Sequence, residues 1–291
     1  MLRNAIELPK QFNFKAAVTD HGWYLLPPFQ ANDDRSVLKR VEALSTGKIV
    51  LLHITQNQNK LMVETGDKQT LTRKESEEVV SKVNWMLRLD EDFRAFYQMC
   101  SADQNMQEIV AENKGRLLRS PSIFEDIVKT IFTTNTTWSR TIAMTTNFVS
   151  HLGGRYSNET ELFTFPAPEA VLKKDKTFLN KSIKLGYRSD YIYDLALNIC
   201  NGVYDLEELT NPEMPTEDVV HKLKEIRGVG PYALSIILML LGRYDFLPVD
   251  SEFKKHVKNK YFAGELPPKS QLQQLYKEWG EFKFLAYWFD K

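Results

Sequence analysis

Residues 216–257 are TEDVVHKLKEIRGVGPYALSIILMLLGRYDFLPVDSEFKKHV, and this stretch indicates the fold most clearly. Thr216 is a good N-cap for a helix that runs to about Ile226. A tight glycine turn follows, and Pro231 suits the first position of a second helix. Gly242 is then placed to end that second helix. The sequence therefore predicts a helix, a glycine hairpin and another helix.

The hairpin has the sequence Gly228-Val229-Gly230. Glycine tolerates positive φ and has no Cβ, so backbone amides at the start of the second helix can come close to a phosphate. The helix dipole also favours an anion at that position. Such a hairpin would hold a DNA backbone without reading its sequence. A plain helical hairpin with a glycine turn is the alternative, because an isolated Gly-x-Gly is a weak signal.

Composition limits the class of protein. The chain has 291 residues, 38 basic and 38 acidic side chains, and two cysteines, Cys100 and Cys200. Its length suits one large or two ordinary domains, and its zero net charge gives no whole-chain sign of a nucleic-acid partner. Two cysteines cannot form a four-cysteine zinc site or iron–sulfur cluster. The N-terminus lacks a signal-peptide apolar region, and the run SIILMLL is too short for a membrane span. We expect a soluble intracellular protein, cytoplasmic and nucleoid-associated if bacterial.

The pattern of apolar residues along the chain changes near Arg73. Short β-branched and aromatic stretches precede it and predict strands of an antiparallel sheet, with a hairpin loop at Gln56–Asn59. These stretches are FNFKAAV, GWYLLPPF, KIVLLHIT and KLMVET. Apolar residues at helical spacing follow almost to the C-terminus. We therefore expect an α+β, mainly helical fold, with an N-terminal antiparallel β subdomain and first helices over 1–115 and a helical domain over 116–291.

The hairpin and the Pro-x-Asp that ends at Asp250 resemble the helix-hairpin-helix (HhH-GPD) superfamily of DNA glycosylases. The relevant members are the 8-oxoguanine and 3-methyladenine II enzymes. The resemblance is strong over about 116–289, where WGEFKFLAYWF supplies a C-terminal aromatic helix, and HGWYLLPPF resembles the opening strand of bacterial members. It implies that Asp250 stabilises the sugar cation and orients or deprotonates the attacking water. Alternatively, Asp250 only N-caps the helix that begins at Ser251, and both roles can hold together.

The segment TTNTTWSR, residues 133–140, resembles a loop of the 8-oxoguanine glycosylases. The resemblance implies that Asn135 fills the gap left by the flipped base and that Arg140 contacts the widowed base. Trp138 would belong to the substrate pocket. Taken without the family, Asn135 is a turn or N-cap residue.

The segment KLGYRSDYIYDLA, residues 184–196, resembles the Gly-Tyr-Arg segment of the same enzymes. There Tyr187 would wedge beside the gap and Arg188 would hydrogen-bond the unpaired base. The alternative is a half-buried Tyr187 and a solvated Arg188.

Tyr232 occupies the place at which the bifunctional members carry a lysine nucleophile. A phenol cannot form an imine, so lyase activity is not expected. The 3-methyladenine type has an aromatic residue here, and Tyr232 would stack on an electron-poor flipped purine or else pack at the helix start. The hypothesis is a monofunctional DNA glycosylase of base excision repair that flips and excises a damaged, alkylated or oxidised purine. The alternatives are a bifunctional enzyme using Lys254 or Lys255, which otherwise serve as phosphate contacts, and a non-catalytic lesion-binding protein.

The resemblance also implies partners. The family often binds a monovalent cation through hairpin carbonyls, here around Ile226 and Val229, and no catalytic cofactor or iron–sulfur cluster is expected. We expect a monomer that binds double-stranded DNA with a damaged base and no membrane. Two basic segments, 173–188 and 252–260, are balanced by the acidic segment 205–218, so the zero net charge is a sum of opposed patches compatible with salt-sensitive DNA binding.

Overall fold

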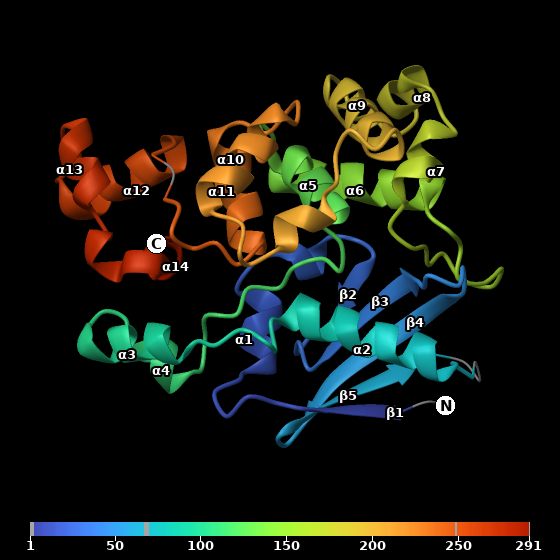
Figure 1. The fold of residues 1–291 in the computed structure, drawn as a ribbon, viewed down its shortest axis with the longest axis horizontal. Coiled ribbons are helices and arrows are strands. Elements are labelled where there is room, and N and C mark those ends of the chain that lie inside the picture. The colour runs from blue at the N-terminus through green and yellow to red at the C-terminus, as the bar shows by residue number, and fades with distance from the viewer. Residues whose placement is uncertain (1–2, 67–69, 248, 291) are drawn as a thin grey trace. The chain divides into compact units, whose positions relative to one another are not determined.

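The computed structural model describes residues 3–66, 70–247 and 249–290, and its ribbon is drawn in Figure 1. The chain forms two compact units. Unit 1 consists of Met1–Glu91 and Glu112–Leu206, and unit 2 of Asp92–Ala111 and Glu207–Lys291. This division differs from the expected boundary after residue 115, because a helical segment from the first half of the chain packs with the C-terminal helices.

Unit 1 contains an antiparallel sheet in the strand order β1-β5-β4-β3-β2. Its strands are β1 (Arg3–Glu7), β2 (Phe29–Ala31), β3 (Val37–Ala43), β4 (Ile49–Asn57) and β5 (Lys60–Thr65). Burial alternates along β4 and β5, which gives the sheet one apolar face. Figure 1 shows α2 (Arg73–Leu87) lying across the sheet.

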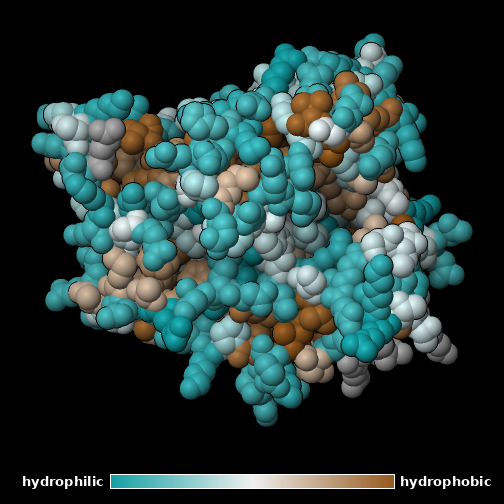
Figure 2. Space-filling view, in the orientation of Figure 1, coloured by the Kyte–Doolittle hydropathy of each residue, from teal (hydrophilic) through white to brown (hydrophobic). Residues whose placement is uncertain are grey.

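The remaining elements of unit 1 are helical. They are α1 (Phe14–Thr19), η1 (Trp23–Leu25), α5 (Ile123–Thr133), α6 (Trp138–Leu152), α7 (Pro168–Leu172), α8 (Lys176–Lys181) and α9 (Arg188–Cys200). Helix α5 is buried from Ile123 to Phe132, so it is the central helix of this unit. Figure 2 shows a mainly hydrophilic face with a hydrophobic area over α9, and the exposed apolar side chains of this part are Leu197 and Val203.

The regular elements of unit 2, over its described residues, are all helices. Its elements are α3 (Arg94–Ala102), α4 (Gln107–Ala111), η2 (Glu207–Thr210), α10 (Thr216–Glu225), α11 (Pro231–Leu240), α12 (Ser251–Tyr261), α13 (Lys269–Gln274), η3 (Lys277–Phe282) and α14 (Lys283–Asp290). The ring of Phe96 in α3 lies 6.2 Å from that of Trp279 and 5.5 Å from that of Phe282. Burial of these aromatic rings explains why α3 belongs with the end of the chain.

The predicted α+β, mainly helical class is confirmed, and so are the antiparallel sheet and the strands at KIVLLHIT and KLMVET. Strands β1 and β3 were not predicted. The loop expected at Gln56–Asn59 is shorter, because β4 continues to Asn57, which pairs with Lys60. Across the part of the chain that the structure describes, no helix is both long and apolar enough to cross a membrane.

Two predicted strands were wrong. FNFKAAV contains helix α1, because Asn13 accepts a hydrogen bond from the Ala16 amide at 3.1 Å and two alanines favour the helix. GWYLLPPF, taken for an opening strand, contains the turn η1, and β2 begins only at Phe29. Trp23 Nε1 donates to Asp126 Oδ1 at 2.7 Å, which draws this segment towards α5.

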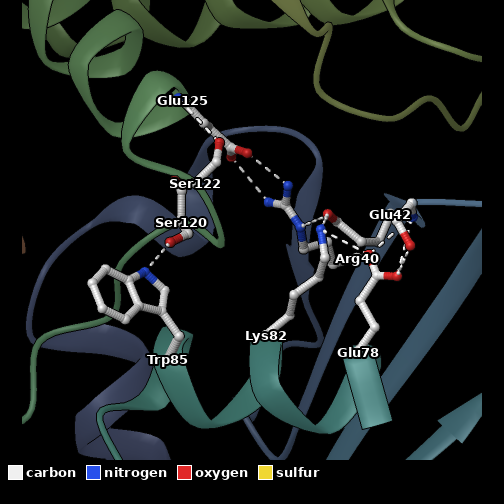
Figure 3. Close-up of polar contacts among 9 residues, drawn as sticks. Arg40, Glu42, Glu78, Lys82, Trp85, Ser120, Ser122 and Glu125 are labelled. Atoms are coloured by element: carbon white, nitrogen blue, oxygen red, sulfur yellow. Dashed lines mark hydrogen bonds and ion pairs between the residues drawn. The ribbon is translucent and has the colours of Figure 1, made fainter. Parts of the chain in front are cut away.

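A buried ion cluster joins the sheet to α5 (Figure 3). Arg40 in β3 donates to both carboxylate oxygens of Glu125 at 2.9 and 2.6 Å, and to Glu42 at 2.7 Å. Lys129 Nζ lies 2.7 Å from Glu125, and both of these side chains are fully buried. Burial alone would raise the pKa of Glu125, but Arg40 and Lys129 outweigh it and lower the pKa to about 2. The cluster therefore fixes α5 to the sheet through full charges.

The helical hairpin forms as predicted, with one exception at its start. Pro231 is in the first turn of α11 and Gly242, with φ +82°, follows the end of that helix. Thr216 is not the N-cap of α10: Pro215 takes that position, and the Thr216 hydroxyl instead lies 3.1 Å from Asp245 Oδ1. The expected C-terminal aromatic helix is divided between η3 and α14, and Gly280, inside η3, has a non-helical backbone.

Candidate functional site

The predicted site residues are divided between the two units. Asn135, Trp138, Arg140, Tyr187 and Arg188 are in unit 1, and the hairpin, Tyr232, Asp250, Lys254 and Lys255 are in unit 2. The predicted proline before Asp250, Pro248, lies outside the described residues. Each group is described within its own unit.

Asn135 stands at the tip of the turn between α5 and α6. Its φ is +47° and its side chain is exposed. Asparagine tolerates this left-handed conformation better than most residues, so the turn presents its side chain to solvent. Thr137 rather than Asn135 is the N-cap of α6, and Arg140, in the first turn, is also exposed. Without the family resemblance, Asn135 was predicted to be either a turn residue or an N-cap. The turn is confirmed and the N-cap is wrong.

Arg188 stabilises the turn that carries Asn135 by hydrogen bonds to backbone carbonyls. Its side chain is buried, with Nε donating to the Ile131 carbonyl at 3.2 Å and Nη2 donating to the Thr134 carbonyl. The alternative of a solvated Arg188 is therefore wrong. Carbonyls at a helix C-terminus lack intrahelical donors, and a guanidinium supplies them. In this structure Arg188 thus holds the end of α5 in the shape that exposes Asn135.

Tyr187 precedes this arginine and is exposed. Its side chain is 49 % accessible, its ring centroid is 5.6 Å from that of Tyr191, and the Arg188 guanidinium lies 4.6 Å from its ring. Since about half of this side chain is open to solvent, its ring can insert into a base stack.

Trp138 is the first residue of α6 and lies against Gly22. A Cβ placed on Gly22, whose φ is +41°, would be 3.3 Å from the indole ring. The indole is still 39 % exposed. One part of the ring is therefore seated on bare backbone, and the exposed part can stack on a flat ligand.

The hairpin in unit 2 has the backbone that the sequence predicts. Gly228 has φ +97°, which favours glycine, whereas Gly230 is exposed with φ −85° and has open space where a Cβ would be. No side chain caps the start of α11. The amides of its first turn are thus free of a side-chain competitor and suit an anion such as a phosphate.

The carbonyls expected to bind a cation belong to the same turn. The Val229 amide donates to the Ile226 carbonyl at 3.1 Å, and both residues are buried. A carbonyl oxygen has a second lone pair, so this hydrogen bond leaves the Ile226 carbonyl able to ligate an ion. The described ranges contain no group of three or more His, Cys, Asp or Glu side chains placed to hold a metal.

Asp250 is the N-cap of α12. Its Oδ1 accepts from the Phe253 amide at 2.8 Å, and the residue is partly exposed. Over the residues described in unit 2, its Oδ2 has no hydrogen-bond partner. One oxygen therefore fixes the carboxylate to the helix, while the other can accept a hydrogen bond from a ligand or water. The capping role predicted for Asp250 is confirmed.

The charge of this carboxylate acts on the Tyr287 phenol of α14. Burial raises the pKa of the Tyr287 phenol, and the charges of Asp250 and Glu252, followed by Tyr232, raise it further. Tyr287 is buried, whereas Tyr232 in the first turn of α11 is 36 % exposed. The Asp250 carboxylate and the exposed ring of Tyr232 thus both belong to unit 2.

Lys254 and Lys255 are both exposed on α12. Lys255 lines an open hollow together with Glu252, His256, Asn259 and Lys260. Cations exposed on this helix suit contacts to phosphates.

The sequence did not predict three contributors: Gly22, Arg40 and Asp290. Gly22 seats Trp138, Arg40 fixes α5 through Glu125, and Asp290 binds the far end of α12. For the two charged residues the trace in the sequence is a charge placed among apolar residues, as in FKFLAYWFD at residues 282–290.

Comparison with known proteins identifies the family of this architecture. A family model described as HhH-GPD superfamily base excision DNA repair protein matches residues 128–282. YfjP of Bacillus subtilis, provisionally named a DNA-3-methyladenine glycosylase, is 27 % identical over 60 % of this chain and 60 % of its own, so less than two thirds of it is covered. A second Bacillus subtilis protein, DNA-3-methyladenine glycosylase, is 22 % identical over 88 % of this chain and 86 % of its own.

Solved structures share the whole fold. The 3-methyladenine DNA glycosylase of Archaeoglobus fulgidus has a TM-score of 0.79 and 22 % identity, with 100 % of this chain and 97 % of that chain covered. The 8-oxoguanine glycosylase/lyase of Clostridium acetobutylicum has a TM-score of 0.76 and 18 % identity, with 99 % and 94 % covered. The family match confirms the resemblance that the hairpin predicted.

Proposed function

The chain belongs to the HhH-GPD superfamily of base excision DNA repair proteins and is accordingly a DNA N-glycosylase, and we propose that it is a monofunctional one that flips a damaged purine from duplex DNA and hydrolyses its N-glycosidic bond. The observation that carries the proposal is the arrangement of Asp250. One of its oxygens caps α12 at 2.8 Å from the Phe253 amide, and the other is open to a ligand.

Asp250 supplies the chemistry. As the bond between the base and C1′ breaks, positive charge develops on the sugar and the fixed carboxylate stabilises it. The open oxygen accepts the proton of a water while the water oxygen bonds to C1′. The hydrogen bond from Phe253 orients the carboxylate before substrate binds, which lowers the cost of reaching this geometry.

Tyr232 argues for water rather than a lysine as the nucleophile. It stands where the resemblance would require an amine, and a phenol forms no imine. Its exposed ring suits stacking on the extruded base, and within unit 1 the exposed part of the Trp138 ring also suits stacking on a flat ligand. Relatives named as 3-methyladenine glycosylases support an alkylated purine, whose electron-poor ring stacks well on these aromatic rings.

DNA binding uses features from both units. The uncapped start of α11 and the open backbone at Gly230 suit contact with one phosphate of the DNA backbone. The exposed side chains of Lys254 and Lys255 suit contacts with neighbouring phosphates. Asn135, Arg140 and Tyr187 are the exposed side chains that would occupy the space left by the flipped base. We further propose a monovalent cation on the carbonyls of Ile226 and Val229, which would fix the hairpin, and a monomeric protein.

Base release and borohydride trapping together test the proposal. Duplexes that contain 3-methyladenine, 7-methylguanine, 8-oxoguanine, hypoxanthine or uracil are incubated with the protein, with and without sodium borohydride. We expect release of at least one damaged purine and no covalent adduct, because no imine forms. An adduct would overturn the monofunctional mechanism, and its loss in Lys254→Ala or Lys255→Ala would identify the nucleophile. Release of none of the five bases would overturn the proposed substrate class.

A further inference from the structure

Asp290, at the C-terminal end of α14, is a buried carboxylate with four side-chain partners. Its Oδ2 lies 2.5 Å from the Tyr276 hydroxyl, 2.6 Å from the Tyr261 hydroxyl and 2.9 Å from His256 Nε2. Its Oδ1 lies 2.8 Å from Lys260 Nζ. Only 6 % of the residue is exposed. Burial alone would raise the pKa of Asp290, but the hydrogen bonds from these partners outweigh it and lower the pKa.

Three of the four partners are on the helix that begins after Asp250. Lys260 and Tyr261 are in the last turn of α12, and His256 is at its middle. At a rise of about 1.5 Å per residue, this end of the helix is about 15 Å from Asp250. Asp290 therefore holds the end of α12 that is opposite the proposed catalytic carboxylate.

A second contact between the same two helices lies near the other end of α12. The ring of Tyr287 in α14 is 5.2 Å from that of Phe253 and 5.7 Å from that of His256. The charges of Asp250 and Glu252 contribute to the raised pKa of Tyr287, as expected if it lies near the start of α12. Contact near both ends leaves α12 little freedom to slide or to rotate about its axis.

The choice of a carboxylate here has a physical reason. Burying an ion pair costs desolvation energy, so apolar side chains in place of the whole cluster would stabilise the fold as well or better. Apolar packing is non-directional, however, whereas hydrogen bonds require defined angles. Four directed contacts to one carboxylate fix the rotation of α12 in a way that packing alone does not.

We infer that Asp290 is a positioning residue for base excision: it sets the axial position and rotation of α12, and thereby the place of the Asp250 carboxylate relative to the sugar. This inference rests on the proposed role of Asp250. Asp290 acts through α12 and does not itself touch the substrate.

A double-mutant cycle tests this inference. Asp290→Asn keeps the shape of the side chain and removes its charge, and we expect single-turnover base release to fall roughly 10- to 100-fold, because small misplacements of a reacting group have effects of this size. The affinity for a duplex containing a stable abasic-site analogue should change less than about twofold. In the Asp250→Asn background, Asp290→Asn should cause no further loss, because the group that it positions is already gone.

A matched control separates positioning from a general change in charge. Glu208→Gln also neutralises a carboxylate of unit 2, one that pairs with Lys222 at 2.7 Å on α10. This variant should release base at the rate of the unchanged protein. If Asp290→Asn does not fold, Tyr261→Phe and Tyr276→Phe each remove one hydrogen-bond donor and enter the same cycle.

Each outcome bears on the inference. A loss that disappears in the Asp250→Asn background supports it. Equal losses in both backgrounds would show a general structural role and overturn it. A full rate of base release in Asp290→Asn, Tyr261→Phe and Tyr276→Phe, measured beside a nearly inactive Asp250→Asn, would also overturn it. That result would leave the proposed function standing. A full rate in Asp250→Asn would overturn the proposed mechanism and the inference with it.

Discussion

Each unit buries a carboxylate beneath an element that carries candidate site residues, but the two carboxylates are held differently. In unit 1, Glu125 lies in α5, which leads into the Asn135 turn, and two buried cations, Arg40 and Lys129, neutralise it. In unit 2, Asp290 holds the helix that begins after Asp250. Its closest partners are the neutral hydroxyls of Tyr261 and Tyr276, and its partner Lys260 is 44 % exposed.

The difference separates a role in stability from a role in geometry. Removing Glu125 leaves two cations with no access to water, which is among the most expensive changes in a protein interior. Removing the charge of Asp290 leaves two phenols, one imidazole and an exposed lysine, and these groups can find other partners. We therefore expect the cluster in unit 1 to determine whether the protein folds, and the one in unit 2 to determine how well a folded protein reacts.

The largest expected effect is that of Glu125→Ala. It should lower the free energy of unfolding by about 3–5 kcal/mol, measured by urea denaturation with circular dichroism, because Arg40 and Lys129 lose their shared counter-ion. Since the pKa of Glu125 is lowered to about 2 in the folded protein, its contribution is complete above about pH 4.5 and disappears as the pH falls towards 2.

The exposed pair between Glu7 and Lys60, at 2.9 Å, supplies the control. Glu7→Ala should change the free energy of unfolding by less than about 1 kcal/mol, because exposed ion pairs contribute little. Similar losses in Glu7→Ala and Glu125→Ala would show that burial does not distinguish them, and would remove the contrast between the two units.

A smaller effect is expected at Gly22, which seats Trp138 in unit 1. Gly22→Ala and Gly47→Ala both place a side chain at positive φ, +41° and +82°, so both should destabilise by about 1 kcal/mol. Only the first places a Cβ against the Trp138 ring, at 3.3 Å, while Gly47 has open space. Base release should therefore fall roughly three- to tenfold in Gly22→Ala alone. Equal rates in the two variants would remove Trp138 from the proposed pocket.

The hairpin was predictable because its signals are local. Pro231, Gly228 and Gly242 each restrict the backbone at their own positions, and Asp250 caps the helix that follows it. The structure agrees with these predictions nearly residue by residue. Thr216 is the exception, because its hydroxyl finds a partner that is distant in the sequence, Asp245.

The N-terminal segments were less predictable because distant contacts decide them. FNFKAAV and GWYLLPPF have the composition of strands, yet the first is helical and the second is drawn to α5 by the hydrogen bond from Trp23 to Asp126. Propensity is a weak guide where such a buried contact competes with it.

The burial of these two carboxylates was difficult to predict from the sequence. Glu125 and Lys129 are spaced i, i+4, a pattern typical of an exposed helix face, but α5 is covered on all sides. Asp290 follows an aromatic run, and its partners at 256, 260, 261 and 276 come together only in the folded unit. Sequence reasoning thus finds residues that shape the local backbone and misses those that support them from a distance.

The most direct test of the account is the single-turnover rate of base release by Asp250→Asn, measured beside its affinity for a duplex with a stable abasic-site analogue. Asparagine keeps an oxygen to accept the Phe253 amide, so α12 stays capped, but it neither stabilises the sugar cation as a carboxylate does nor accepts the proton of the attacking water. We predict that DNA binding is retained while base release falls to a small residual rate, the rate on which the cycle with Asp290→Asn is measured. Undiminished base release would contradict the central claim that Asp250 carries the chemistry.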